Sequence, residues 1–205
     1  MKFVPASDRS LLVTLGEGIS VDTNARVHLL SHRLQSVPGI TSQSPAYSSL
    51  LIRFDPLRLT HEELEALIKG TPLDLKAAPE PRIIDIPVHY DGPDLAEVAE
   101  RHLLTPAQVI ETHTHTVYHA YFAGFVPGFV YLGEVPAIIA TPRRATPRLE
   151  VPAGSVAIAG TQTAVYPKST PGGWNLIGRT SAIMFDATQG RALVEPGDRV
   201  RFIPL

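Results

Sequence analysis

Short apolar runs separated by glycine and proline fill the chain from Val117 onward, and they limit the folds that this part can adopt. Runs such as 155–159, 163–166 and 200–203 are shorter than an ordinary helix and are bounded by turn-forming residues. Several short strands at such spacing predict a β-sandwich or a closed β-barrel. The 19 prolines and 15 glycines among 205 residues stay below the share typical of low-complexity chains. We therefore expect a globular fold with many turns.

The first part of the chain has a different pattern, in which strands and helices alternate. A strand candidate at 11–15 is followed by apolar residues at helical spacing within 27–37. Two more strands are expected within 40–54, before a capping box at Thr60–Glu63 that opens a second helix. With a last strand near 73–77, this order is the ferredoxin-like β-α-β-β-α-β arrangement.

The sequence Ala-Ala-Pro-Glu-Pro at 77–81 is the best candidate for a linker, because its prolines favour an extended connection. We therefore predict the α+β class, with a small α/β domain at 1–81 and a β-barrel domain at 82–205. Within the second domain, Thr105 and Pro106 predict the N-cap and the first residue of a helix.

Composition excludes several kinds of protein. The chain has no cysteine, which excludes disulfides, thiolate zinc sites, iron–sulfur clusters and a cysteine nucleophile. The sequence has neither an apolar run near the length of a membrane span nor a signal peptide. A net charge of −2 shows no basic excess, which argues against general nucleic-acid binding. We expect a cytoplasmic protein with no membrane or nucleic-acid partner.

The stretch 136–185 carries five basic residues and one acid in a chain whose net charge is negative. Such a surface suits an anionic ligand, since arginine binds carboxylate or phosphate oxygens in bidentate fashion. The alternative is a solvated face with its basic residues spread around the barrel, and charge alone favours this alternative. The bases are Arg143, Arg144, Arg148, Lys168 and Arg179, and the acid is Glu150.

Two glycine-rich segments can either fill the barrel or approach a ligand. Three glycines and a proline constrain the aromatic residues of 124–133, whose Tyr131 has a polar tip. Gly172-Gly173 allows close approach of the backbone, and core packing is the expected role of Trp174, which follows. Gln162 can orient a substrate amide or cap a strand end.

The histidines at 113, 115 and 119 do not indicate a metal site. Alternate histidines on a strand share a face, but no carboxylate follows at a recognisable ligand spacing. We therefore expect no metal, and we expect His113 to be buried and hydrogen-bonded. The sequence also has neither a nucleophile elbow nor a P-loop.

Four motifs occur in order between residues 124 and 180: GFVPGFVYLG, ATPRRATPRLEVPAGSVAIAG, QTAVYP and STPGGWNLIGRT. This set resembles the family of the bacterial 5-oxoprolinase B subunits, which also includes allophanate hydrolase subunit 1 and a sporulation kinase inhibitor. The resemblance extends over about 84–205 and is weaker in the N-terminal SDRSLLVTLGEGI. Ala164 stands where the family pattern has glycine, and Glu134 and Val135 replace a glycine-rich continuation.

The resemblance implies a small ferredoxin-like domain followed by a cyclophilin-like β-barrel. It implies an ATP-dependent hydrolase complex that cleaves 5-oxo-L-proline to L-glutamate, in which the partners are the A and C subunits and C is a paralogue of this chain. ATP with Mg²⁺ would be bound by the complex. The alternatives are an inhibitor of a sensor histidine kinase, a subunit of an allophanate hydrolase or urea carboxylase type of enzyme, and a non-catalytic scaffold.

The resemblance also implies roles for individual residues. Arginines would hold phosphate or the substrate carboxylate, Gln162 and Tyr166 would bond the amide, and aromatic rings would wall the pocket. His113 would be a proton carrier or a structural residue. The candidate catalytic residues are His113, Arg148, Arg179 and Gln162, and the candidate substrate-binding residues are Tyr131, Arg143, Arg144, Tyr166, Gly172, Gly173 and Trp174.

Overall fold

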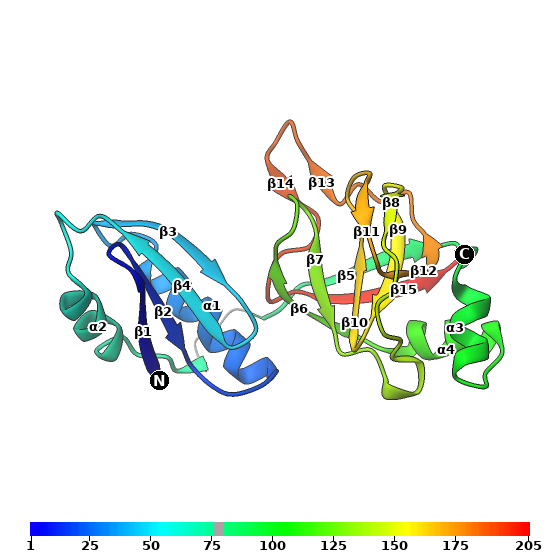
Figure 1. Cartoon of the computed structure of the whole chain (residues 1–205), viewed down its shortest axis with the longest axis horizontal. Coiled ribbons are helices and arrows are strands. Elements are labelled where there is room, and N and C mark those ends of the chain that lie inside the picture. Colours follow the sequence, from blue (N-terminus) through cyan, green and yellow to red (C-terminus); the bar gives the residue numbers. More distant parts are fainter. Residues whose placement is uncertain (76–79) are drawn as a thin grey trace. The chain divides into compact units, whose positions relative to one another are not determined.

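The computed structural model describes residues 1–75 and 80–205. The chain divides into two compact units, Met1–Glu80 and Pro81–Leu205, which Figure 1 shows. Residues 77–79 of the predicted linker lie outside the described residues. Helices and sheets occur in both units, which confirms the α+β class. None of the described helices has the length and apolar character needed to span a membrane.

The first unit is a four-stranded antiparallel sheet with two helices on one face. The strands lie in the order β1-β2-β4-β3. Alternate residues of β2 and β4 pack against the apolar sides of both helices. The elements are β1 (Lys2–Ser7), β2 (Ser10–Thr14), α1 (Val21–Leu34), β3 (Ile40–Pro45), β4 (Ser49–Phe54) and α2 (His61–Lys69).

One edge of this sheet differs from the prediction. Residues 73–75 of the predicted last strand form no strand, and 76–77 lie outside the described residues. Strand β1 instead supplies the edge beside β2. It is mostly exposed and contains Pro5, so it lacks the alternation of a half-buried strand. An edge strand tolerates proline because one side of its backbone needs no partner.

The second unit is built on a seven-stranded sheet in the order β12-β9-β10-β7-β6-β15-β5. Strands β15 and β5 are parallel, and the other neighbours are antiparallel. Two small sheets, β8-β11 and β13-β14, accompany it (Figure 1). The elements are β5 (Ile83–Val88), α3 (Leu95–Arg101), α4 (Pro106–His115), β6 (Tyr118–Ala123), β7 (Val130–Gly133), η2 (Ala137–Ile139), β8 (Arg148–Val151), β9 (Ser155–Ala159), β10 (Gln162–Val165), β11 (Thr170–Gly172), β12 (Asn175–Arg179), β13 (Phe185–Asp186), β14 (Arg191–Ala192) and β15 (Arg199–Pro204).

The two ends of the seven-stranded order meet, so the sheet is nearly closed into a barrel. His89 and Arg179 exchange two backbone hydrogen bonds, of 2.9 and 2.8 Å. This seam needs two glycines. A Cβ on Gly178 would lie 2.6 Å from the His89 carbonyl oxygen, and one on Gly92 would lie 2.3 Å from the Ile177 carbonyl carbon. Side chains at either position would therefore push the two ends of the sheet apart.

The barrel sheet has an apolar inner face and a second cluster on its outer face. Val156 and Ile158 of β9 point into the main core, to which helices α3 and α4 add apolar side chains. The alternating residues Ala157 and Ala159 lie in the outer cluster. Their small side chains leave room for larger groups on this face.

Candidate functional site

Aromatic rings cover the small residues on the outer face of the barrel. The ring centroids of Phe129 and Trp174 are 5.5 Å apart, and those of Tyr131 and Trp174 are 5.8 Å apart. Tyr166 packs edge-on against Phe129 at 5.3 Å. Ala164, which departs from the family pattern, is fully buried in the same cluster. We call Phe129, Tyr131, Tyr166 and Trp174 the aromatic wall.

The hydroxyl of Tyr166 lies directly over Gly172. A Cβ on Gly172 would be 2.4 Å from that hydroxyl oxygen, so glycine is required for this position of the ring. Burial raises the pKa of Tyr166, and this effect outweighs the opposing effects of a backbone hydrogen bond from Trp174 and of the nearby Arg143 and Arg148. The hydroxyl is therefore protonated at neutral pH and can donate a hydrogen bond.

The segment Pro142–Arg148, here called the arginine loop, is fastened to the barrel at several points. Asn175 Nδ2 donates to the Pro142 carbonyl at 2.8 Å, and the Arg144 amide donates to the Gly173 carbonyl at 2.8 Å. Its prolines also fix their φ angles. The loop holds its arginines in place without a ligand.

Asp94, immediately before helix α3, organises two of these arginines. Its side chain is 4% exposed and accepts hydrogen bonds from Arg144 Nη1 at 2.9 Å and Arg148 Nη2 at 2.6 Å. The Leu176 amide donates to its other oxygen at 2.7 Å. Sequence reasoning missed Asp94. The only signal was that the basic surplus of 136–185 had to be balanced elsewhere in the chain.

Two features of this arrangement suit an anionic ligand. Arg148 Nη1 is buried, and within the described residues it has no hydrogen-bond partner. An unsatisfied charged donor is costly, and a ligand oxygen would remove that cost. Arg143 lies over the Trp174 ring with its guanidinium carbon 5.9 Å from the centroid, in cation–π contact. The outer face thus combines protonated donors with a flat apolar wall.

His113 lies in the barrel interior rather than in this site. Its Nδ1 is 2.8 Å from the Tyr90 hydroxyl and its Nε2 is 2.9 Å from Thr163 Oγ1. Because the Thr163 hydroxyl donates to the Ala157 carbonyl, His113 Nε2 carries the proton in this network. The ring stacks on Phe202 at 4.6 Å, and burial lowers its pKa to about 3. These contacts favour the structural role over the proton carrier.

Two more predicted residues lie away from the arginine loop. Arg179 is at the barrel seam, 69% exposed, and its Nε donates to Asp91 at 2.8 Å. Gln162 begins β10 and is half-buried. No hydrogen bond or ion pair in the described part of the chain joins either residue to Asp94. The structure therefore brings together most of the predicted site residues. They are Tyr131, Arg143, Arg144, Arg148, Tyr166, Gly172, Gly173 and Trp174.

The metal interpretation placed alternate histidines on a strand, which the structure corrects. His113 and His115 belong to helix α4, because the capping box at Thr105 starts a helix that continues to His115. Among residues 1–75 and 80–205, no group of three or more His, Asp or Glu side chains could hold a metal ion.

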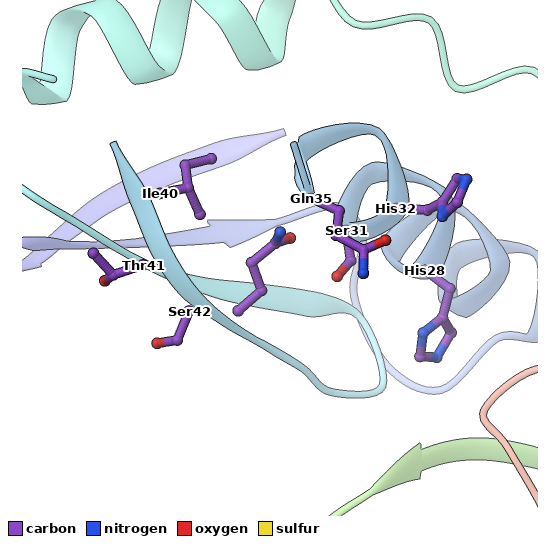
Figure 2. A pocket seen from close by; sticks show the side chains of 8 residues that line it. His28, Ser31, His32, Gln35, Ile40, Thr41 and Ser42 are labelled. Carbon is purple, nitrogen blue, oxygen red and sulfur yellow. The ribbon is translucent and has the colours of Figure 1, made fainter. Parts of the chain in front are cut away.

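A separate hollow of about 460 Å³ lies in the first unit, away from every predicted site residue. Figure 2 shows that one wall is helix α1 and the other is strand β3. Its lining is polar and includes His28 and His32 but no carboxylate. The labelled residues are His28, Ser31, His32, Gln35, Ile40, Thr41 and Ser42.

Comparisons with known proteins support the family resemblance that the motifs of the barrel indicate. The family model "Carboxyltransferase domain, subdomain C and D" matches residues 1–194. The chain is 42% identical to the B subunit of 5-oxoprolinase from Escherichia coli O157:H7, over 96% of this chain and 93% of that protein. It is 38% identical to the 5-oxoprolinase B subunit of Haemophilus influenzae, over 99% of this chain and 97% of that protein.

A solved structure shows the same fold in a longer chain. The crystal structure of TTHA0988 superposes with a TM-score of 0.88 at 40% identity. The match covers 96% of this chain but only 40% of TTHA0988, so the present chain spans less than half of that protein. Together with the full-length matches above, this similarity shows that the chain belongs to the carboxyltransferase subdomain C and D family, in the group of the 5-oxoprolinase B subunits.

Proposed function

We propose that this chain is the B subunit of an ATP-dependent 5-oxoprolinase. The complex would open 5-oxo-L-proline to L-glutamate, with the A and C subunits as partners, of which C is a paralogue of this chain. The observation that carries the proposal is the buried Arg148 Nη1, which lies near Tyr166 of the aromatic wall and has no hydrogen-bond partner among the described residues, in a chain similar to 5-oxoprolinase B subunits over nearly its whole length. The substrate is a small ring with a carboxylate and an amide, which suits such a surface.

Each part of the substrate has a partner on this face. Arg148 Nη1 would donate to the carboxylate, as charge-assisted hydrogen bonds to arginine are among the stronger ones. The protonated Tyr166 hydroxyl would donate to the lactam oxygen. Tyr131 and Trp174 would pack against the ring, and Arg143 would hold the charge of a phosphate. Asp94 is already bonded to two arginines and a backbone amide, so it positions these groups and is not a base.

The chemistry needs activation of a stable amide. The lactam oxygen would attack the terminal phosphorus of ATP, which releases ADP. Water would then add to the activated carbon, the ring C–N bond would break to leave the amine, and hydrolysis would release the phosphate. Guanidinium groups that face the reacting oxygens stabilise the charge that develops on them. In this proposal the chain supplies one wall of the site, and ATP with Mg²⁺ is bound by the complex.

The test is glutamate release from 5-oxoproline by the assembled complex, with ATP and with each of the three proteins omitted in turn. We expect Arg148→Ala to lower turnover by about a hundredfold or more, the usual effect of removing a charge-stabilising donor. Lys168→Ala is the matched control, since it removes one exposed positive charge from the same basic stretch. Wild-type turnover in Arg148→Ala, in a complex that assembles normally, would overturn the assignment. Arg179→Ala tests the remaining arginine prediction.

A further inference from the structure

A cavity of about 400 Å³ lies on the side of the arginine loop next to helix α3. Arg143 and Arg144 of the loop line it, together with Arg101 from the end of the helix. Glu97 is the only acid among the residues that line it. The volume lies within the range of about 300–1,000 Å³ that is common for small-molecule sites. Arg148 is not part of its lining, so this cavity is distinct from the position proposed for the substrate carboxylate.

The cavity has an excess of positive charge. Arg144 is neutralised by Asp94 at 2.9 Å and by Glu97 at 3.1 Å. Arg101 and Arg143, in contrast, form no ion pair with any residue in 1–75 or 80–205. Two arginines, one from a helix and one from a loop, therefore line the same cavity without a counter-ion from the described chain.

The walls of the cavity are fixed before any ligand binds. Asn175 Nδ2 donates to the carbonyls of Pro142 and Ile158, which ties the start of the arginine loop to strands β9 and β12. In addition, His102 Nε2 lies 3.0 Å from Thr141 Oγ1 and links the end of α3 to the residue that precedes the arginine loop. Because these groups are already ordered, binding loses less conformational entropy.

We propose that this cavity binds a phosphate group. A phosphate monoester carries a charge of about −1.5 to −2 at neutral pH and presents three strong acceptor oxygens, which matches two unneutralised guanidiniums better than a single carboxylate does. The inference deepens the proposed function and rests on it for the source of the phosphate. Asp94 then joins two anion positions, because it bonds both Arg144 at the phosphate cavity and Arg148 at the carboxylate position.

Titration calorimetry on the full chain, purified alone, tests the proposal with inorganic phosphate, ADP, ATP and acetate as probes. We expect the double variant Arg101→Ala/Arg143→Ala to weaken phosphate and ATP binding at least tenfold, and Lys168→Ala to leave it unchanged. Circular dichroism of each variant shows whether it is folded. Equal affinity for phosphate and ATP would indicate inorganic phosphate as the ligand, and much tighter binding of ATP would indicate a nucleotide.

Three results would overturn the proposal: no binding of phosphate or ATP by the wild-type chain, acetate binding as tightly as phosphate, or equal affinities in the folded double variant. The outcome is separable from the proposed function. Arg148→Ala should retain phosphate binding in this assay while it loses glutamate release in the complex. Phosphate binding by a chain whose complex leaves 5-oxoproline intact would support the cavity and refute the proposed function.

Discussion

Two polar clusters, one inside the barrel and one along the edge of strand β12, differ in charge and in how completely they are bonded. The inner cluster of Tyr90, His113 and Thr163 is neutral, because burial lowers the pKa of His113 to about 3 and raises that of Tyr90. Both ring nitrogens of His113 have partners. The outer cluster of Asp94, Arg144 and Arg148 is charged, and Arg148 Nη1 is left unbonded.

The difference indicates what each cluster is for. A buried network in which every polar group is bonded fixes one packing of the core, and nothing in it is available to a ligand. A charged network that contains a buried, unbonded donor is incomplete until an acceptor binds to it. Burial of a titratable group therefore does not by itself mark a reactive site in this molecule. The unpaired donor is the better marker.

Removal of Asp94 should have the largest effect on stability. Asp94→Ala removes the acceptor of Arg148 Nη2 and of the Leu176 amide, and it leaves Arg144 paired with Glu97 alone. Breaking a buried ion pair costs about 3–5 kcal/mol, and we expect about 3 kcal/mol because the two arginines are partly exposed. Urea unfolding measures the loss. Asp94→Asn keeps one acceptor oxygen and should lose less, and equal losses in the two variants would contradict the importance of hydrogen bonding here.

The inner cluster should respond to pH, and the variant His113→Phe isolates its contribution. Above pH 6.5 His113 is neutral in both the folded and the unfolded chain. Below that pH the unfolded chain binds a proton that the folded chain, with its pKa of about 3, does not. Stability therefore falls by about 1.4 kcal/mol per pH unit from this group, or about 2 kcal/mol between pH 6.5 and 5.

The free energy of unfolding of wild type and His113→Phe, measured from pH 7 to pH 5, checks this prediction. The variant should be less stable at pH 7, since Tyr90 and Thr163 lose a partner, but its stability should depend less on pH. If the free energy of unfolding changed with pH equally in the two proteins, His113 would not be neutral and buried as described. Phosphate binding should be unchanged in the variant, since none of Tyr90, His113 and Thr163 lines the phosphate cavity.

The smallest loss of stability is expected for a substitution beside the aromatic wall. Gly172→Ala places a methyl group 2.4 Å from the Tyr166 hydroxyl, so the ring must move. Overpacking of this kind costs about 1–3 kcal/mol, and we expect about 1 kcal/mol because Gly172 is only half-buried. Gly173→Ala is the control, as its nearest neighbour would be at 3.6 Å. If the two variants release glutamate at equal rates, Tyr166 does not contact the substrate as proposed.

Local features of the fold could be predicted because both partners of each interaction are close in sequence. The capping box at Thr60–Glu63 has its two hydrogen bonds at 3.2 and 2.8 Å, and a second one at Thr105 begins α4 at Pro106 as expected. Strand β1 was missed because its edge position, and not its side-chain pattern, allows it to pair.

The candidate site was only partly predictable. The residues from Tyr131 to Trp174 lie in motifs that the sequence shows directly, and they gather on one face of the sheet. Asp94 is 50 and 54 residues from the arginines that it binds, and no local pattern identifies such a contact. His113 was singled out by its chemistry, yet the tertiary packing of α4 against β15 places it in the interior.

The position of β15 affects how a nascent chain can fold. This strand is the last of the second unit in sequence, yet it lies inside the sheet, between β6 and the end strand β5. Until residues 199–204 have left the ribosome, β5 lacks its parallel neighbour and exposes the side chains of Ile84 and Ile86. At about 5–20 residues per second, this interval lasts several seconds. In the first unit the last strand, β4, also lies between two earlier strands, but it follows β2 after far fewer residues, so we expect this sheet to form during synthesis while the barrel awaits β15.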